Sequence, residues 1–159
     1  MISKPYEEIS IGDIETTSSK TITEEYVRAF AELTGDRHPL HLMPEYAQET
    51  RFGKQIAHGA LIISTLLGLV ELHPSYLQCF YGLNNVEFKA PTYFGDSIHV
   101  VTEITSVNPG KSGMSAVVGS YARVINQDGN VVLSGDFSML VAGTEAALDD
   151  PRMLVERVR

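Results

Sequence analysis

The pattern of apolar and polar positions divides the chain into a helical first half and a strand-rich second half. Residues 14–22 are rich in Thr and Ser, which predicts a polar strand or an extended entry segment. Residues 23–35 predict a helix, because Thr23 is a favourable N-cap and Gly35 a favourable stop. The apolar face of this helix would consist of Tyr26, Phe30 and Leu33. Asp36 then lies just past a helix end.

The next stretch contains two prolines. Pro39 cannot continue a helix and favours an extended backbone at His38. We therefore expect residues 36–41 to form a tight, stiff loop. Pro44 can open a short helix that runs through Gln48.

Residues 58–72 carry apolar side chains on every side, which is typical of a helix enclosed by other structure. The longest apolar run, residues 60–70, has about half the length needed to cross a bilayer. We expect a buried helix rather than a membrane span.

Five extended runs follow this helix, separated by segments rich in Pro, Gly and Asn. They comprise residues 78–83, 86–88, 97–107, 115–125 and 131–141. A helix that is apolar all round, followed by a long antiparallel sheet, predicts an α+β fold in which the sheet curves around the helix. We assign residues 1–143 to this single domain and residues 144–159 to a charged tail or short helix.

Composition and charge narrow the function classes. A chain of 159 residues with 43% apolar residues forms one globular domain. A formal charge of -8 and a pI near 5.0 make nucleic acid and anionic membranes unfavourable partners. Cys79 is the only cysteine, and residues 1–10 lack the apolar stretch of a secretory signal, so we expect a cytoplasmic location.

Candidate chemistry concentrates in the window G-D-R-H-P-L-H at residues 35–41, followed by His58 and Gly59. A longer pattern surrounds it: F-A-E-L-T-G-D-R-H-P-L-H at 30–41, Ala47, F-G at 52–53, I-A-H-G-A-L at 56–61 and, more weakly, V-E-F-K-A-P-T-Y-F-G-D at 86–96. This pattern resembles the signature of the MaoC-like dehydratases, also called hydratase-2 or (R)-specific enoyl-CoA hydratases. The resemblance implies a single hot-dog fold and the hydration of trans-2-enoyl thioesters to (R)-3-hydroxyacyl thioesters, or the reverse dehydration.

The resemblance also implies roles for individual residues. In the family pattern G-D-x-N-P-x-H the Asp and the His hold the catalytic water, and these positions are Asp36 and His41. The backbone amide of Gly59 corresponds to an oxyanion donor. His38 replaces the family's asparagine, which removes an amide expected to brace the loop or bind substrate. No metal or redox cofactor is implied.

The chemistry can also be reasoned from the residues. Adding water to a C=C bond conjugated to a thioester needs a base, an acid and a donor for the developing enolate oxygen. Asp36 and His41 suit the first two roles, and the absence of a Cβ at Gly59 would let an acyl carbonyl approach the helix N-terminus. We expect burial against the helix to disfavour the charged form of Asp36, while its carboxylate favours the imidazolium form of His41. Which group gives the proton and which takes it stays open.

Other interpretations of these histidines compete. We group His58 and His38 with Gly59 as candidate substrate-binding residues, although His58 can equally orient the loop or cap its helix. Three histidines and an aspartate could in principle bind zinc. They lack the spacing of structural and hydrolytic zinc sites, so we expect no metal.

Two other functions compete with hydration. A hot-dog thioesterase generally carries an acid on its central helix, and no carboxylate occurs between His58 and Glu71. A noncatalytic acyl-thioester-binding or partner subunit would explain the substitution at His38, but both Asp36 and His41 are retained. We therefore expect an enzyme, an enoyl-CoA hydratase or 3-hydroxyacyl-thioester dehydratase.

Partners follow from the same reasoning. The resemblance implies a homodimer or a dimer-based oligomer with an acyl tunnel near the subunit boundary, and the open strand edges of a lone sheet favour the same assembly. We expect acyl-CoA rather than acyl carrier protein as substrate, because carrier proteins are usually acidic and this chain is too. Four cations have two possible roles: they are ordinary solvated charges, or one or two of them contact the phosphates of coenzyme A. They are Arg51, Lys54, Lys89 and Lys111.

Overall fold

The computed structural model describes residues 2–149 and confirms that helices precede the long strands. The helices are α1 (Glu24–Thr34), α2 (Pro39–Leu42), α3 (Pro44–Gln48) and α4 (Gly59–Leu69). The strands are β1 (Ile14–Thr16), β2 (Lys20–Thr21), β3 (Leu77–Phe88), β4 (Ser97–Pro109), β5 (Ser115–Ile125) and β6 (Val131–Ala142). Short 3-10 turns lie at Tyr6–Glu8 and Thr144–Ala146.

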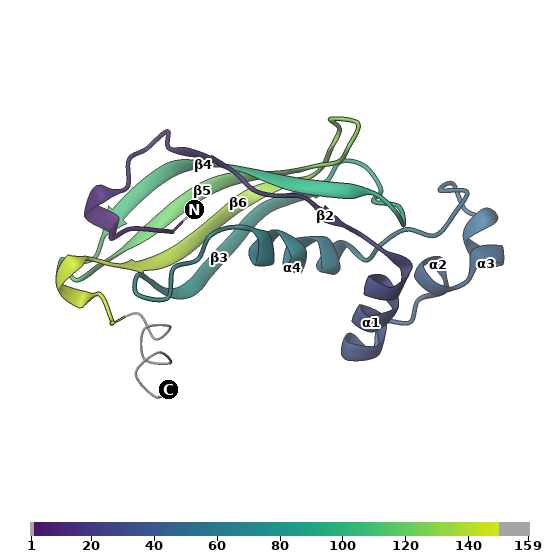
Figure 1. Ribbon diagram of the computed structural model, residues 1–159, viewed down its shortest axis with the longest axis horizontal. Helices are drawn as coiled ribbons and strands as arrows, with labels where there is room; N and C mark the ends of the chain where they lie inside the picture. Colours follow the sequence, from purple (N-terminus) through teal and green to yellow (C-terminus); the bar gives the residue numbers. More distant parts are fainter. Residues whose placement is uncertain (1, 150–159) are drawn as a thin grey trace, which may run out of the picture.

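The strands pair antiparallel in the order β1, β4, β5, β6, β3, and β2 pairs with the beginning of β4. The curved sheet passes over α4, while α1, α2 and α3 extend beyond one end of it (Figure 1). Residues alternate between buried and more exposed along β4 and β5, so one face of the sheet forms the core. The predicted α+β class and hot-dog arrangement are confirmed.

The sheet covers one side of α4 rather than enclosing it. Leu61, Ile62 and Leu66 are buried in the core. The opposite side of α4 carries small exposed residues, which are Ala60, Ser64 and Gly68. The predicted enclosure on every side is therefore wrong for the single chain.

The C-terminal end of α4 lies at Leu69, earlier than the predicted residue 72. The backbone of Glu71 accepts a hydrogen bond from the N–H of Ile2 at 2.8 Å, and the His73 N–H donates to the carbonyl of Ile2 at 2.7 Å. Pairing with the N-terminal segment replaces the last turn of the predicted helix.

β3 unites the two runs predicted at residues 78–83 and 86–88. Its pairing with β6 shifts register between Asn84 and Glu87, and Asn85 has a φ of 50°. Such a bulge bends a strand without ending it, which is why the two runs form one element.

α1 has the predicted ends. The Oγ1 of Thr23 accepts a hydrogen bond from the Tyr26 N–H at 3.1 Å, and Gly35 takes the left-handed conformation with a φ of 78°. Leu33 is 84% exposed, because the helix turns Val27 rather than Leu33 toward the core. The predicted apolar face is wrong at Leu33.

The predicted loop at residues 36–41 is partly helical. His38 is extended, with a ψ of 133°, as expected before proline. Pro39, however, occupies the first position of the one-turn helix α2, where its missing N–H does no harm. His41 therefore lies on a helix and not in a loop, and Pro44 opens α3 as predicted.

The C-terminal region is described as far as Asp149. The N–H of Leu148 donates to the backbone oxygen of Ser75 at 3.1 Å, which ties this end to the domain. The rest of the predicted tail, residues 150–159, lies outside the described residues. Within residues 2–149, every helix is too short or too polar to cross a lipid bilayer.

Candidate active site

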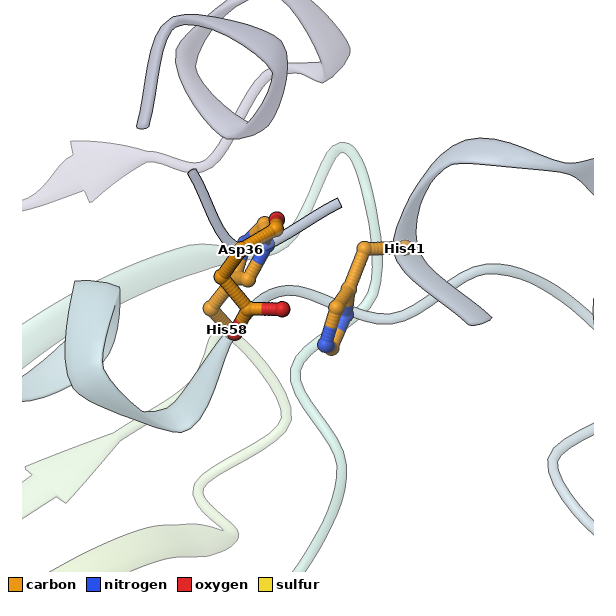
Figure 2. Close-up of side chains that lie close together, drawn as sticks. All are labelled: Asp36, His41 and His58. Carbon is orange, nitrogen blue, oxygen red and sulfur yellow. Dashed lines mark hydrogen bonds between the residues drawn. The ribbon is translucent and has the colours of Figure 1, made fainter. Parts of the chain in front are cut away.

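Three side chains from separate parts of the chain meet beside the N-terminal end of α4 (Figure 2). Asp36 follows α1, His41 lies on α2, and His58 immediately precedes α4. One ring nitrogen or carboxylate oxygen from each lies within 4.8 Å of the others. The structure thus brings Asp36 and His41 together, as their spacing predicts.

His41 is held in one orientation by the segment that precedes α4. Its Nδ1 lies 2.7 Å from the backbone oxygen of Ile56, and the side-chain amide of Gln55 donates to the His41 carbonyl at 3.1 Å. Because a carbonyl oxygen only accepts, Nδ1 carries the proton in the first contact. In the neutral ring, Nε2 keeps the lone pair that can take a proton.

Burial of the His41 ring lowers its pKa below the ordinary histidine value. The carbonyl of Ile56 and the carboxylate of Asp36 act in the opposite direction, but desolvation outweighs them. The carboxylate of Asp36 thus favours the imidazolium form as expected, but the net shift is toward the neutral ring because burial outweighs it. A neutral imidazole with a free Nε2 is suited to act as a base near neutral pH.

His58 is buried and touches both members of the pair. Its Nε2 lies 2.9 Å from the backbone oxygen of Asp36 and donates to it, and its ring stacks on that of His41 with centroids 3.8 Å apart. Its side chain makes no capping hydrogen bond to α4. These contacts agree with orienting the loop and not with capping the helix.

Asp36 is exposed, contrary to the expected burial against the helix. It follows α1, which extends beyond the end of the sheet (Figure 1). Its Oδ1 accepts a long hydrogen bond of 3.3 Å from the N–H of His38. The carboxylate is therefore accessible to water and to a ligand that enters from solvent.

His38 braces the backbone in place of the family's amide. Its Nδ1 accepts the N–H of Leu40 at 3.2 Å and so caps α2. The ring meets that of Tyr46 edge-on, with centroids 5.8 Å apart. These contacts give His38 a structural role at the start of α2.

A cavity of about 310 Å³ opens beside the cluster. His41 and Gly59 line it together with apolar residues that include Ile62 of α4 and Phe88 of β3. Among the described residues, Asp36, His38 and His58 do not line this cavity. The cavity therefore reaches the cluster from the side of His41.

The missing side chain at Gly59 makes room for the Phe88 ring and not, as expected, for an acyl carbonyl. A Cβ at this position would lie 2.6 Å from the ring of Phe88, so the ring occupies the direction predicted for an acyl carbonyl. The N–H of Gly59 is the first in α4 and has no acceptor inside the helix. It is available as a donor to a ligand in the cavity.

The cluster is poorly arranged to bind a metal ion. A histidine coordinates through a lone pair that lies in the plane of its ring. The stacked rings of His41 and His58, inclined by 30°, direct such lone pairs side by side rather than at one point. One nitrogen of each ring is also already hydrogen bonded to a backbone carbonyl.

Sequence reasoning missed two groups that hold His41. Ile56 acts through its carbonyl, which every residue type possesses, so the sequence contains no signal for it. Gln55 acts through its side chain, and its position directly before the I-A-H-G-A-L run is the one available signal.

Comparison with known proteins identifies the family. Residues 10–125 match the MaoC like domain. The chain belongs to this family. A 3-hydroxybutyryl-CoA dehydratase from Methylorubrum extorquens is 37% identical over 107 residues, which cover 65% of this chain and 66% of the relative. An (R)-specific enoyl-CoA hydratase from Rhodospirillum rubrum is 31% identical over 139 residues, which cover 86% of this chain and 90% of the relative.

Solved structures agree with this MaoC-like assignment. An R-hydratase from Pseudomonas aeruginosa superposes with a TM-score of 0.72 and 30% identity, covering 87% of this chain and 86% of that one. The MaoC-like chain therefore has hydratases and dehydratases of acyl thioesters as relatives, and it shares their hot-dog fold.

Proposed function

We propose that this MaoC-like protein hydrates trans-2-enoyl thioesters to (R)-3-hydroxyacyl thioesters, or catalyses the reverse dehydration. The proposal rests on the approach of Asp36 and His41 within 4.8 Å beside a cavity that Gly59 also lines. Two hydrogen bonds of about 2.8 Å to one water molecule span such a distance. The names of the relatives support the same class of reaction.

In the hydration direction, His41 Nε2 takes one proton from the water while the water oxygen bonds to C3 of the enoyl group. The π electrons of the C2–C3 bond move toward the thioester carbonyl, whose oxygen gains negative charge. His41 then gives its proton to C2, which restores the carbonyl. The water ends as a hydroxyl on C3 and a hydrogen on C2.

Asp36 and Gly59 support this transfer without exchanging a proton. The carboxylate of Asp36 accepts the second O–H of the water and so orients its oxygen toward C3. Its negative charge also stabilises the transient imidazolium of His41. The N–H of Gly59 donates to the enolate oxygen at the positive end of the α4 dipole.

The proposed reaction uses no metal and no redox cofactor. An imidazole moves the proton, and a backbone amide stabilises the charge on the carbonyl oxygen. The stacked arrangement of His41 and His58 supports this choice over zinc chemistry. A cytoplasmic location remains a prediction from the single cysteine.

The reaction is tested with crotonyl-CoA. We expect a loss of absorbance at the enoyl-thioester band without release of free thiol, and chiral chromatography should identify the (R)-3-hydroxy product. A thioesterase would release free thiol, and a noncatalytic binding subunit would change neither signal. Either of these results would contradict the proposal.

We also propose that two copies associate through β3. This strand pairs with β6 on one side, and no described strand pairs with its other edge. Several of its large apolar side chains are exposed, namely Phe80, Tyr81, Leu83 and Phe88. An uncovered apolar edge favours pairing with a second strand. Because Phe88 also lines the cavity, that cavity would then reach the subunit boundary.

Sedimentation equilibrium tests this assembly. The expected mass is twice 17.5 kDa at micromolar concentration. The substitution Tyr81→Lys should shift the equilibrium toward the monomer, because each copy would bring a positive charge to the proposed contact. A wild-type protein that sediments at the monomer mass would contradict the proposed dimer.

A further inference from the structure

A second cavity, of about 360 Å³, lies near the C-terminal end of α4 and is lined in part by Glu71, which follows that helix. Its other walls come from the N-terminal segment, from β1 and from β4. The N-terminal segment before β1 lies at the end of the sheet away from α1, α2 and α3 (Figure 1). Among the described residues, none lines both this cavity and the one beside His41. The second cavity is therefore separate from the candidate active site.

A buried hydroxyl faces this cavity. Thr102 and Ile104 line it from β4, and because they are two positions apart they lie on the same face of the sheet. Thr102 is only 2% exposed, and its backbone pairs in register with Glu15 of β1 and Ala122 of β5. The Thr102 side chain is therefore the part that reaches the cavity. Its hydroxyl has no hydrogen-bond partner among residues 2–149, which favours a ligand that can supply one.

The charged groups that line the cavity are mostly negative. They are the carboxylates of Asp13, Glu15 and Glu71 and the ammonium of Lys4. The Lys4 ammonium lies 3.5 Å from the Asp13 carboxylate, so this pair is largely neutral. Glu71 is exposed and takes part in none of the ion pairs of residues 2–149. A negative cavity on a chain of formal charge -8 favours a cationic ligand.

The carboxylates are too far apart to hold one metal ion. Within the described part of the chain, three potential metal ligands converge only in the cluster of Asp36, His41 and His58. Apolar side chains, including those of Ile9 and Ile104, lie between the charged groups that line the second cavity. Separated negative groups on an apolar surface suit an elongated organic cation with an aliphatic body.

We propose that this cavity binds a small aliphatic diamine. One ammonium group pairs with the carboxylate of Glu71, and the other donates a hydrogen bond to the hydroxyl of Thr102. The methylene chain between them packs on Ile9 and Ile104. This inference does not depend on the proposed hydration of enoyl thioesters, because the two cavities have no lining residue in common.

An NMR titration of the full chain with 1,5-diaminopentane tests the site. We expect saturable shifts of amide signals from residues that line the cavity, with one diamine bound per chain. Thr102→Val keeps the shape of the side chain and should weaken binding about tenfold, because it removes a hydrogen bond to a charged group. Glu71→Gln should weaken binding about threefold, because an exposed ion pair contributes less.

The matched control is Glu103→Gln. Glu103 is adjacent to Thr102 on β4, but it is exposed on the opposite face of the sheet and is not among the lining residues. This variant loses the same charge as Glu71→Gln and should keep the wild-type affinity. The melting temperature shows whether Thr102→Val is folded. If it is not, the comparison of Glu71→Gln with Glu103→Gln decides.

Three results would overturn the proposal. The first is the absence of saturable binding to the wild type. The second is equal weakening by Glu71→Gln and Glu103→Gln, which would reveal attraction by the overall charge alone. The third is binding of 1,5-pentanediol, which has the same chain length and no charge, as tightly as the diamine. Weaker binding of the diol, together with an unchanged Glu103→Gln variant, would support the diamine site.

Discussion

In the proposed mechanism, His41 determines the pH range in which the protein is active. Because desolvation lowers its pKa, the ring stays neutral to a lower pH than an ordinary histidine. Activity should be present above the folded-state pKa of His41 and fall as the pH drops through it. The acid limb of kcat/KM for crotonyl-CoA should therefore lie below about pH 6.5. An acid limb above that value would contradict the role of neutral His41.

His58 should contribute to catalysis by holding Asp36 and His41 in place. His58→Phe keeps a ring against His41 but removes the donor to the Asp36 carbonyl, whereas His58→Gln keeps an N–H donor of similar reach. We expect the Phe variant to lose about tenfold in kcat and the Gln variant to recover part of this loss. KM should change less than kcat in both.

The control for His58 separates positioning from stability. Thr65→Val removes a buried hydroxyl from α4 that donates to the Leu61 carbonyl and lies 3.4 Å from the Tyr26 hydroxyl, and Thr65 is not a member of the cluster. Its melting temperature should change without a change in kcat measured well below that temperature. If kcat follows the melting temperature in all these variants, His58 has a structural role alone.

His38 should tolerate substitution by asparagine, the residue of the family pattern. Asparagine can cap α2 as histidine does here, because a side-chain oxygen can accept the N–H of Leu40. We expect His38→Asn to keep kcat and KM within about twofold of the wild type, because asparagine would replace one N-cap of α2 by another. A complete loss of turnover would show that His38 contacts the substrate.

The site could be predicted from side chains but not from backbone contacts. Asp36 and His41 were found because a carboxylate and an imidazole stand at a distinctive spacing around Pro39. The effect of the Asp36 carboxylate on His41 was predicted, but the larger opposing effect of burial was not, because the sequence does not reveal how deeply the ring is buried. The carbonyl of Ile56, which fixes its tautomer, has no sequence signal at all.

At the scale of elements, α4 and β3 are coupled where Gly59 meets Phe88. A methyl group at Gly59 would lie 2.6 Å from the Phe88 ring, so Gly59→Ala must displace that ring. We expect the substitution to destabilise the protein by about 1 kcal/mol in denaturant unfolding. Adding Phe88→Ala should remove most of this penalty. Strictly additive effects of the two substitutions would contradict the contact.

The ends of elements were predictable where local chemistry determines them. Thr23 and Gly35 delimit α1 because a cap and a left-handed residue act within one turn. The end of α4 depends instead on pairing of residues near Glu71 with Ile2, far away in the sequence. The bulge at Asn85 likewise depends on the register with β6. Long-range pairing of this kind leaves no local pattern.

At the scale of the whole molecule, the chain has the predicted fold, and the candidate site lies beside the N-terminal end of α4. The curved sheet packs on α4 as the apolar pattern predicts, while α1, α2 and α3 extend past the sheet (Figure 1). Asp36 follows α1 and His41 lies on α2, and both side chains lie near His58, which directly precedes α4 (Figure 2). The single chain leaves one side of α4 and the edge of β3 open. The proposed second copy would cover the edge of β3.

The most direct test of the central claim is the turnover of crotonyl-CoA by Asp36→Asn and His41→Ala, with circular dichroism and melting temperature confirming that each variant is folded. If a carboxylate and an imidazole jointly hold and activate one water, each substitution should lower kcat by about a hundredfold or more. A folded variant of either kind that turns over at the wild-type rate would contradict this mechanism.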